Sequence, residues 1–395
     1  MENQETMSTM PTKEQVDQQP NTPVVKKRME EQDVAKGIAI FMVMALHILV
    51  IQSEFYQVVA VFSGFIMGLF FFLSGFNYKP GRTYKENVIK RIKQMVIPFV
   101  IYISIVSFIS GLYLILTNQA TFLQILETFC YDMLGSQFST QIGLTTACVL
   151  FHRNIMIGWF IIMLITASFI FYAVVDLCLK NMYSFISINI LLLSITILLG
   201  YLNFSLPFYL REATTIASIM LFGALFKKYK VFQSTNKMWI IINSIIAYGL
   251  YIGMALIFRG GGFIMGGKLL NSFGPLEGLI TLVYAIFGSY AFLNFCKLLA
   301  KVKWLKFALT YLGNYSVYYL LLHQLVKFFL QEMFNYHPTA MMMSSEVTEG
   351  MSFLILFLTI VVITLYIILL NFIKKKIKEN KENKAKLGAL ENESK

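Results

Sequence analysis

Ten apolar stretches, each close to the length that crosses a lipid bilayer, occupy most of this 395-residue chain. A helix needs about 20 mostly apolar residues to span the hydrocarbon core. Charged residues make up only 14% of the chain, whereas a soluble domain is about 25% charged. The sequence therefore predicts an all-α fold, a polytopic integral membrane helix bundle of about ten transmembrane helices. The predicted spans are 34–52, 58–76, 94–117, 157–176, 184–202, 212–226, 238–258, 275–296, 308–333 and 352–373.

Positive charges are concentrated in alternate gaps between these stretches. One set of gaps holds 22 Lys and Arg, and the other set holds four. Because cytoplasmic loops carry the excess of Lys and Arg, both termini are predicted to be cytoplasmic. The net charge of +12 thus reflects membrane topology, and no nucleic-acid partner is expected. The four cations assigned to the outer side are Arg153, Arg211, Arg259 and Lys268.

Polar segments flank the predicted membrane domain, which covers residues 34–373. Residues 1–33 lack an apolar core segment, so they are expected to be a disordered cytoplasmic tail and not a cleavable signal. Residues 374–395 form a charged cytoplasmic tail. The longest outer segment, 118–156, alternates apolar and polar residues, which favours short helices on the outer leaflet that could cover a cavity.

The four cysteines indicate neither a zinc site nor a disulfide framework. There is no CxxC pair and no nearby histidine at ligand spacing, so we predict no metal site. Cys130 and Cys148 both fall in the outer segment and can pair if that face is oxidising. Unpaired packing cysteines are the alternative interpretation.

The first span contains two ionisable residues on one face. His47 follows Lys36 by eleven residues, which turn a helix by about 1100° and raise it by about 16 Å. Both side chains therefore lie on one stripe, with Lys36 at the cytoplasmic mouth and His47 beyond the bilayer centre. Charged or titratable residues inside a membrane indicate function. The alternatives are a packing histidine and a lysine that extends its ammonium to the interface.

A basic run leads into the third span. Lys90, Arg91 and Lys93 precede Gln94 and then Pro98. Such a run is either a topology determinant or a site for a polyphosphate. Because a proline disturbs the helix and frees backbone groups, Pro98 favours a ligand site nearby.

The ninth span carries a second histidine. His323 and Lys327 are four residues apart and share a face. His323 is predicted at a depth similar to that of His47, so the two rings could line one cavity. A structural hydrogen bond is the alternative role for His323.

Three further residues lie near the predicted outer surface. Glu277 begins the eighth span, and Trp159 opens the fourth span after Arg153. Each residue is either an interfacial anchor or part of a binding site on the outer side.

Five motifs occur in order along the bundle: DVAKGIAIFMVMALHILV, FFFLSGF, RIKQMVIPF, GWF and YSVYYLLLH. Together they resemble the acyltransferase family 3 membrane proteins, and the resemblance covers residues 24–376. It implies a multi-pass protein of the bacterial cell membrane that moves an acyl group, commonly acetyl, from cytoplasmic acyl-CoA to a hydroxyl of a cell-surface glycan. The chain is similar to the stand-alone form of the family.

The resemblance also implies roles for particular residues. His47 matches the essential catalytic histidine, and Arg91 matches the first of two paired arginines. Lys36 and Gln94 replace arginines of the family pattern. Lys36 retains the positive charge, and Gln94 retains only hydrogen bonding. The residues implied on the acyl-CoA side are Lys36, Lys90, Arg91, Lys93 and Gln94. The residues expected on the acceptor side are Arg153, Trp159, Glu277 and His323.

Two other classes of protein are also compatible with the sequence. The expected partners are acyl-CoA as the donor substrate, a glycan acceptor and the lipid bilayer. No tightly bound cofactor is expected, and a homo-oligomer is compatible with the sequence. The main alternative is an exporter or flippase of a surface glycan or its lipid-linked precursor. A glycan polymerase is a third class, but it would be expected to carry more than four outer cations.

Overall fold

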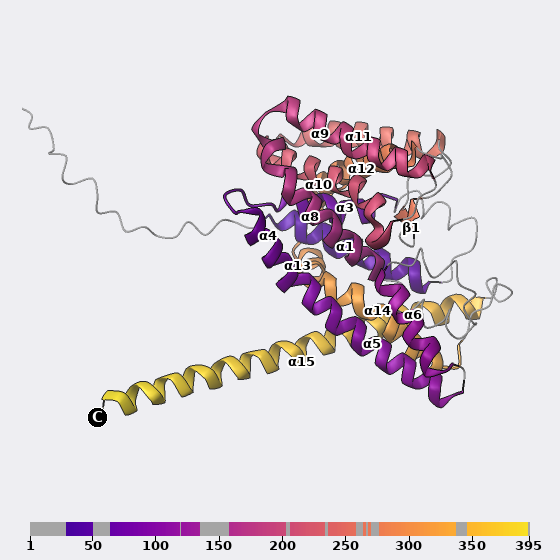
Figure 1. Cartoon of the computed structure of the whole chain (residues 1–395), viewed down its shortest axis with the longest axis vertical. Helices are drawn as coiled ribbons and strands as arrows, with labels where there is room; N and C mark the ends of the chain where they lie inside the picture. Colours follow the sequence, from indigo (N-terminus) through magenta and orange to yellow (C-terminus); the bar gives the residue numbers. More distant parts are fainter. Residues whose placement is uncertain are drawn as a thin grey trace, which may run out of the picture.

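The computed structural model shows a bundle of helices (Figure 1). It describes residues 29–49, 64–118, 120–134, 158–202, 206–233, 236–257, 264–265, 268–269, 276–336 and 346–393. In chain order the elements are α1 (Glu30–Ile48), α3 (Ile66–Phe76), α4 (Tyr84–Arg91), η2 (Ile92–Val96), α5 (Ile97–Leu116), α6 (Phe122–Leu134), α8 (Gly158–Lys180), α9 (Met182–Tyr201), η4 (Pro207–Tyr209), α10 (Leu210–Lys228), η5 (Val231–Gln233), α11 (Lys237–Ile257), β1 (Ile264–Met265), β2 (Lys268–Leu269), α12 (Glu277–Leu299), α13 (Lys303–Asn314), α14 (Ser316–Met333) and α15 (Glu346–Glu393). The two strands form a short antiparallel pair.

Each of the ten predicted spans overlaps at least one described helix. Among the described residues, five helices are long and apolar enough to cross a membrane: Tyr84–Leu116, Trp159–Lys180, Met182–Tyr201, Glu277–Leu299 and Gly350–Asn380. Shorter apolar helices cover Ile66–Phe76 and Lys237–Gly253. The chain is therefore a helical membrane bundle, while the count of ten spans and the cytoplasmic position of both termini stay predictions.

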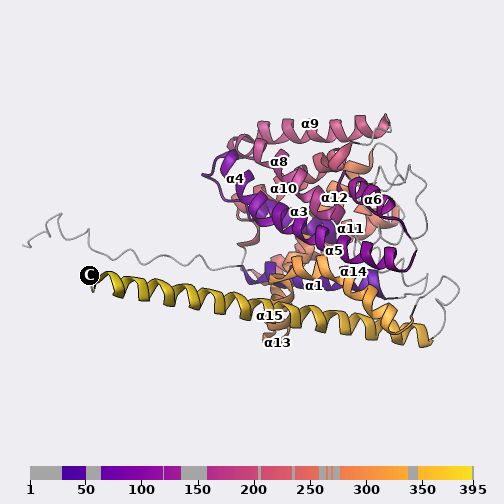
Figure 2. The ribbon, with the colours of Figure 1, turned by 60° about the horizontal axis from the view of Figure 1, so that its bottom comes forward.

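Helix α10 lies inside the bundle and is buried along most of its length. It packs against α3, α8, α9 and α12. By contrast, α5, α9, α11 and α15 expose many large apolar side chains. Exposed apolar faces on a membrane helix are the surfaces that contact lipid tails. Helix α15 extends beyond the bundle (Figures 1 and 2), so the charged segment that follows the last span continues as a helix through Glu393.

The ninth predicted span is not one helix. It divides at Tyr315, whose φ of −106° and ψ of 16° end α13 before α14 begins. Gly313 and Asn314 are weak helix formers at this position. Figure 2 shows α13 turning away from the line of α14.

Helix α13 packs closely against α1. A Cβ on Gly37 would lie 2.0 Å from the carbonyl oxygen of Leu309, and a Cβ on Gly313 would lie 1.9 Å from that of Asp33. The two backbones can therefore approach this closely only where both helices have glycine. As a result, α13 packs on the N-terminal part of α1, while α14 meets its C-terminal end through His47.

The third predicted span contains one turn of π-helix. The N–H of Ile97 donates to the carbonyl of Ile92, five residues earlier, in η2. Pro98 has no N–H, and its ring would clash with the carbonyl four residues before it. The wider turn accommodates the proline, and such turns are frequent at functional sites.

Candidate active site

Two histidines from distant parts of the chain meet in the bundle. His47 lies in the last turn of α1, and His323 lies in the middle of α14. Their ring centroids are 5.2 Å apart, and the ring planes are inclined by 65°. The sequence placed these rings at a common depth, and the structure brings them into direct contact.

Backbone hydrogen bonds determine which ring nitrogen is available. The Nδ1 atom of His47 is 2.7 Å from the carbonyl oxygen of Val43. The Nδ1 atom of His323 is 2.9 Å and 2.8 Å from the carbonyl oxygens of Tyr319 and Leu320. Because a carbonyl oxygen only accepts, Nδ1 must carry the proton in each neutral ring. Nε2 then has the free lone pair.

The two histidines differ in their surroundings. His47 is exposed, whereas His323 is fully buried, and in the described part of the chain its Nε2 has no hydrogen-bond partner. An exposed Nε2 with a lone pair can accept a proton from a substrate hydroxyl. His47 therefore has the geometry of a general base. His323 is placed to restrict the orientation of the His47 ring.

Lys327 connects α14 to the end of α1. It lies one turn after His323, and its Nζ donates to the carbonyl oxygen of His47 at 2.5 Å. The last carbonyls of a helix have no partner within the helix, and a cation there is also favoured by the helix dipole. The sequence indicated that Lys327 shares a face with His323 but did not reveal this contact, because periodicity does not show which neighbouring helix that face meets.

Other side chains hold α14 in place. The Tyr319 hydroxyl is 2.7 Å from the Thr364 hydroxyl of α15. The Tyr102 hydroxyl of α5 donates to the carbonyl of Leu321. The helix that carries His323 is thus bonded to α1, α5 and α15.

The residues predicted to bind acyl-CoA occupy two places. Lys36 Nζ is 3.2 Å from the Oδ1 atom of Asp33 on the same helix. Arg91 points into the protein, where its Nη2 donates to Ser74 Oγ and its Nη1 contacts Met95 Sδ, each at 2.8 Å. Its guanidinium carbon also lies 5.8 Å from the ring centroid of Tyr172. Arg91 therefore joins α3, η2 and α8, while its neighbours Lys90, Lys93 and Gln94 are exposed.

Of the residues predicted on the acceptor side, His323 contacts His47, whereas Trp159 lies on α8 and Glu277 on α12. Trp159 packs edge to face on Phe160, with ring centroids 6.0 Å apart. Glu277 is fully buried at the start of α12, and neither carboxylate oxygen has a hydrogen-bond partner in the described part of the chain. Arg153 and Cys148 lie outside the described residues, and Cys130 has a free thiol.

A cluster of threonines near Glu277 was not foreseen. Thr196 Oγ1 lies 2.5 Å from Thr214 Oγ1 and 3.0 Å from Thr215 Oγ1. Gly278 fits closely against this cluster, since a Cβ there would be 2.7 Å from Thr196 Cγ2. The threonines come from α9 and α10, and the packing of these helices brings them together beside α12.

The fold and the histidine pair define a helical membrane protein with a candidate acid–base centre at the junction of α1 and α14. A family model described as an acyltransferase domain matches residues 30–371. The chain therefore belongs to acyltransferase family 3, which confirms the resemblance seen in its motifs, and it is a membrane acyltransferase. Comparisons with curated proteins and with solved structures give no match.

Proposed function

We propose that this acyltransferase moves an acyl group, with acetyl as the first candidate, from cytoplasmic acyl-CoA to a hydroxyl of an extracytoplasmic cell-surface glycan. The bacterial cell membrane is the proposed location. The observation that supports this proposal is the geometry of His47, whose Nδ1 is bonded to Val43 while Nε2 stays available. The family match favours this function over a glycan exporter, which would need no acid–base residue.

The proposed reaction transfers the acyl group in one step from the thioester sulfur to the hydroxyl oxygen of the acceptor. Nε2 of His47 accepts the proton of the acceptor hydroxyl as its oxygen attacks the thioester carbonyl carbon. The tetrahedral intermediate then collapses, the carbon–sulfur bond breaks, and the thiolate takes the proton back from His47. The products are an O-acyl ester and free CoA, and His47 returns to its starting state.

The donor is proposed to enter from the side on which Lys36 lies. CoA is a polyanion with a long arm, so its phosphates need cations while its thioester must reach His47. The helix between Lys36 and His47 rises about 16 Å, which is on the scale of that arm. Arg91 and the exposed residues Lys90, Lys93 and Gln94 are the proposed further contacts with the donor. Trp159, Glu277, Arg153 and His323 stay proposals for the acceptor side.

Reconstituted protein provides the direct test. Wild-type protein in lipid nanodiscs is incubated with radiolabelled acetyl-CoA and surface glycan, and acylated glycan is measured. His47→Ala should lose transfer, because a positioned base contributes about 10²- to 10⁴-fold in rate. His323→Ala should lose less if His323 only orients its neighbour. Folded His47→Ala protein that acylates glycan at the wild-type rate would remove His47 from the mechanism, and wild-type protein with no acylated product would support an exporter.

A further inference from the structure

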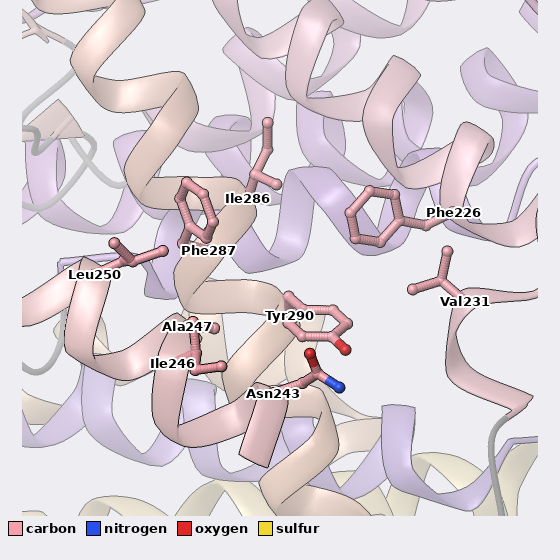
Figure 3. Close-up of a pocket in the computed structure, with 9 residues that line it drawn as sticks. All are labelled: Phe226, Val231, Asn243, Ile246, Ala247, Leu250, Ile286, Phe287 and Tyr290. Carbon is pink, nitrogen blue, oxygen red and sulfur yellow. The ribbon is translucent and has the colours of Figure 1, made fainter. Parts of the chain in front are cut away.

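A second site lies away from the histidines. A cavity of about 280 Å³ is present between the end of α10, η5, α11 and α12. Figure 3 shows the aromatic and aliphatic side chains around it, with the amide of Asn243 beside the hydroxyl of Tyr290 at one end. No lining residue belongs to α1 or α14, so the cavity is distinct from the proposed reaction centre. The lining residues are Phe226, Val231, Asn243, Ile246, Ala247, Leu250, Ile286, Phe287 and Tyr290.

The cavity is continuous with an exposed apolar face of α11. Ile246 and Leu250 line the cavity and are 54% and 49% exposed. Ile242 and Ile245 continue this apolar face, with 44% and 66% of their surface exposed. In a membrane helix such a face lies against lipid tails, so the cavity opens toward the bilayer. Seven of the nine lining side chains are apolar, which selects a hydrocarbon occupant.

Cations lie beyond the polar end of the cavity. Lys237 begins α11 six residues before Asn243, which is about 9 Å along the helix. Lys230 immediately precedes Val231, and both lysines are exposed.

Helix α12 also carries a lysine beyond the polar end of the cavity. Lys297 follows Tyr290 by seven residues, about 10 Å along the helix. Its Nζ donates to the carbonyl of Phe232 and lies 5.5 Å from the centroid of that ring, which is itself 5.7 Å from the ring of Tyr290. Moving into the cavity, a ligand therefore meets first cations, then two hydrogen-bonding side chains and finally apolar walls.

We propose that this cavity holds one acyl chain of an anionic membrane phospholipid. A phospholipid has the same order of groups, since an anionic phosphate is followed by ester carbonyls and then by hydrocarbon. Lys230 and Lys237 bind the phosphate, and Tyr290 donates to an ester carbonyl. Basic pockets between membrane helices on the cytoplasmic side are suited to anionic head groups, and these lysines fall on the predicted cytoplasmic side. This site does not depend on the proposed transfer reaction.

The test measures retained lipid on the full-length protein. Protein from nanodiscs of equal parts phosphatidylglycerol and phosphatidylcholine is moved into detergent, and the bound lipid is counted by native mass spectrometry. Ala247→Phe fills the cavity and should lower retained phosphatidylglycerol at least five-fold. Gly249→Phe is the matched control on the same helix, because a Cβ there meets nothing within 4 Å, and it should retain the wild-type amount.

A second pair of variants tests the head-group contact without altering the cavity. Each lysine near the membrane surface contributes about 1 kcal/mol, a factor of about five, so Lys230→Gln with Lys237→Gln should weaken retention about 25-fold. Lys375→Gln with Lys378→Gln removes the same charge from an exposed part of α15, which does not line the cavity, and should leave retention unchanged. Equal retention of both lipids, or unchanged retention in the Lys230 and Lys237 double variant, would overturn the proposal. Retained free fatty acid in place of phospholipid would overturn it as well.

Discussion

Replacing Lys327 with methionine should slow acyl transfer without weakening donor binding. The change keeps a flexible side chain but removes the ammonium that donates to the carbonyl of His47. A hydrogen bond from a charged group contributes about 1.5–3 kcal/mol, and here it secures the last turn of α1. A catalytic group misplaced by about 1 Å costs roughly 10²-fold in rate. We therefore expect kcat to fall roughly 10- to 100-fold.

The assay follows transfer from radiolabelled acetyl-CoA to glycan at several donor concentrations. The KM for acetyl-CoA should stay within about two-fold, because the proposed donor cations Lys36 and Arg91 are unchanged. Lys327→Arg retains a cationic donor and should recover most of the rate, which a purely steric role would not explain. A folded Lys327→Met protein with wild-type kcat would refute the view that this contact positions His47.

Three further predictions concern packing, donor binding and topology. Gly37→Ala and Gly313→Ala should each lower the free energy of unfolding by about 1–3 kcal/mol, because the added methyl group meets backbone atoms of the facing helix. The control Gly253→Ala places its methyl group in open space and should leave the stability unchanged, and thermal unfolding in nanodiscs compares the three variants. Arg91→Ala should weaken acyl-CoA binding about ten-fold or more in calorimetry and Lys36→Arg should not, and unchanged affinity for Arg91→Ala would move the donor site elsewhere. Reporter fusions should read inside after residues 85, 232 and 380 and outside after 56, 145 and 340, and an inside result at 145 would contradict the acceptor side as proposed.

The sequence was sufficient to locate the helices because burial in lipid requires long apolar segments whose backbone groups bond internally. It could not show the break at Tyr315. Nor could it show the close packing of α13 on α1, because that contact depends on glycines in two different helices, Gly37 and Gly313, and hydropathy does not record how closely two backbones approach.

For the candidate site, the sequence predicted which residues are involved but not how they contact one another. The depths of His47 and His323 follow from counting residues, but their contact depends on the rotation of α1 against α14. The inward orientation of Arg91 depends on partners in α3 and α8, and a basic run in the sequence cannot distinguish an inward guanidinium from exposed lysines. Side chains that act locally were therefore easier to predict than those whose partners come from elsewhere in the bundle.

The two helices formed from the ninth span hold α1 at both ends, and this has a consequence for donor selection. Helix α13 packs on the N-terminal part of α1, and α14 packs at its C-terminal end. Between Lys36 and His47, α1 is one uninterrupted helix. If the donor binds as proposed, the separation between its anionic end and its reactive carbon is fixed by the protein. Selectivity would then depend on the length of the thiol arm. Acyl groups of different size would extend past His47 without moving the thioester, so a truncated thiol carrier should fail even when it bears the preferred acyl group.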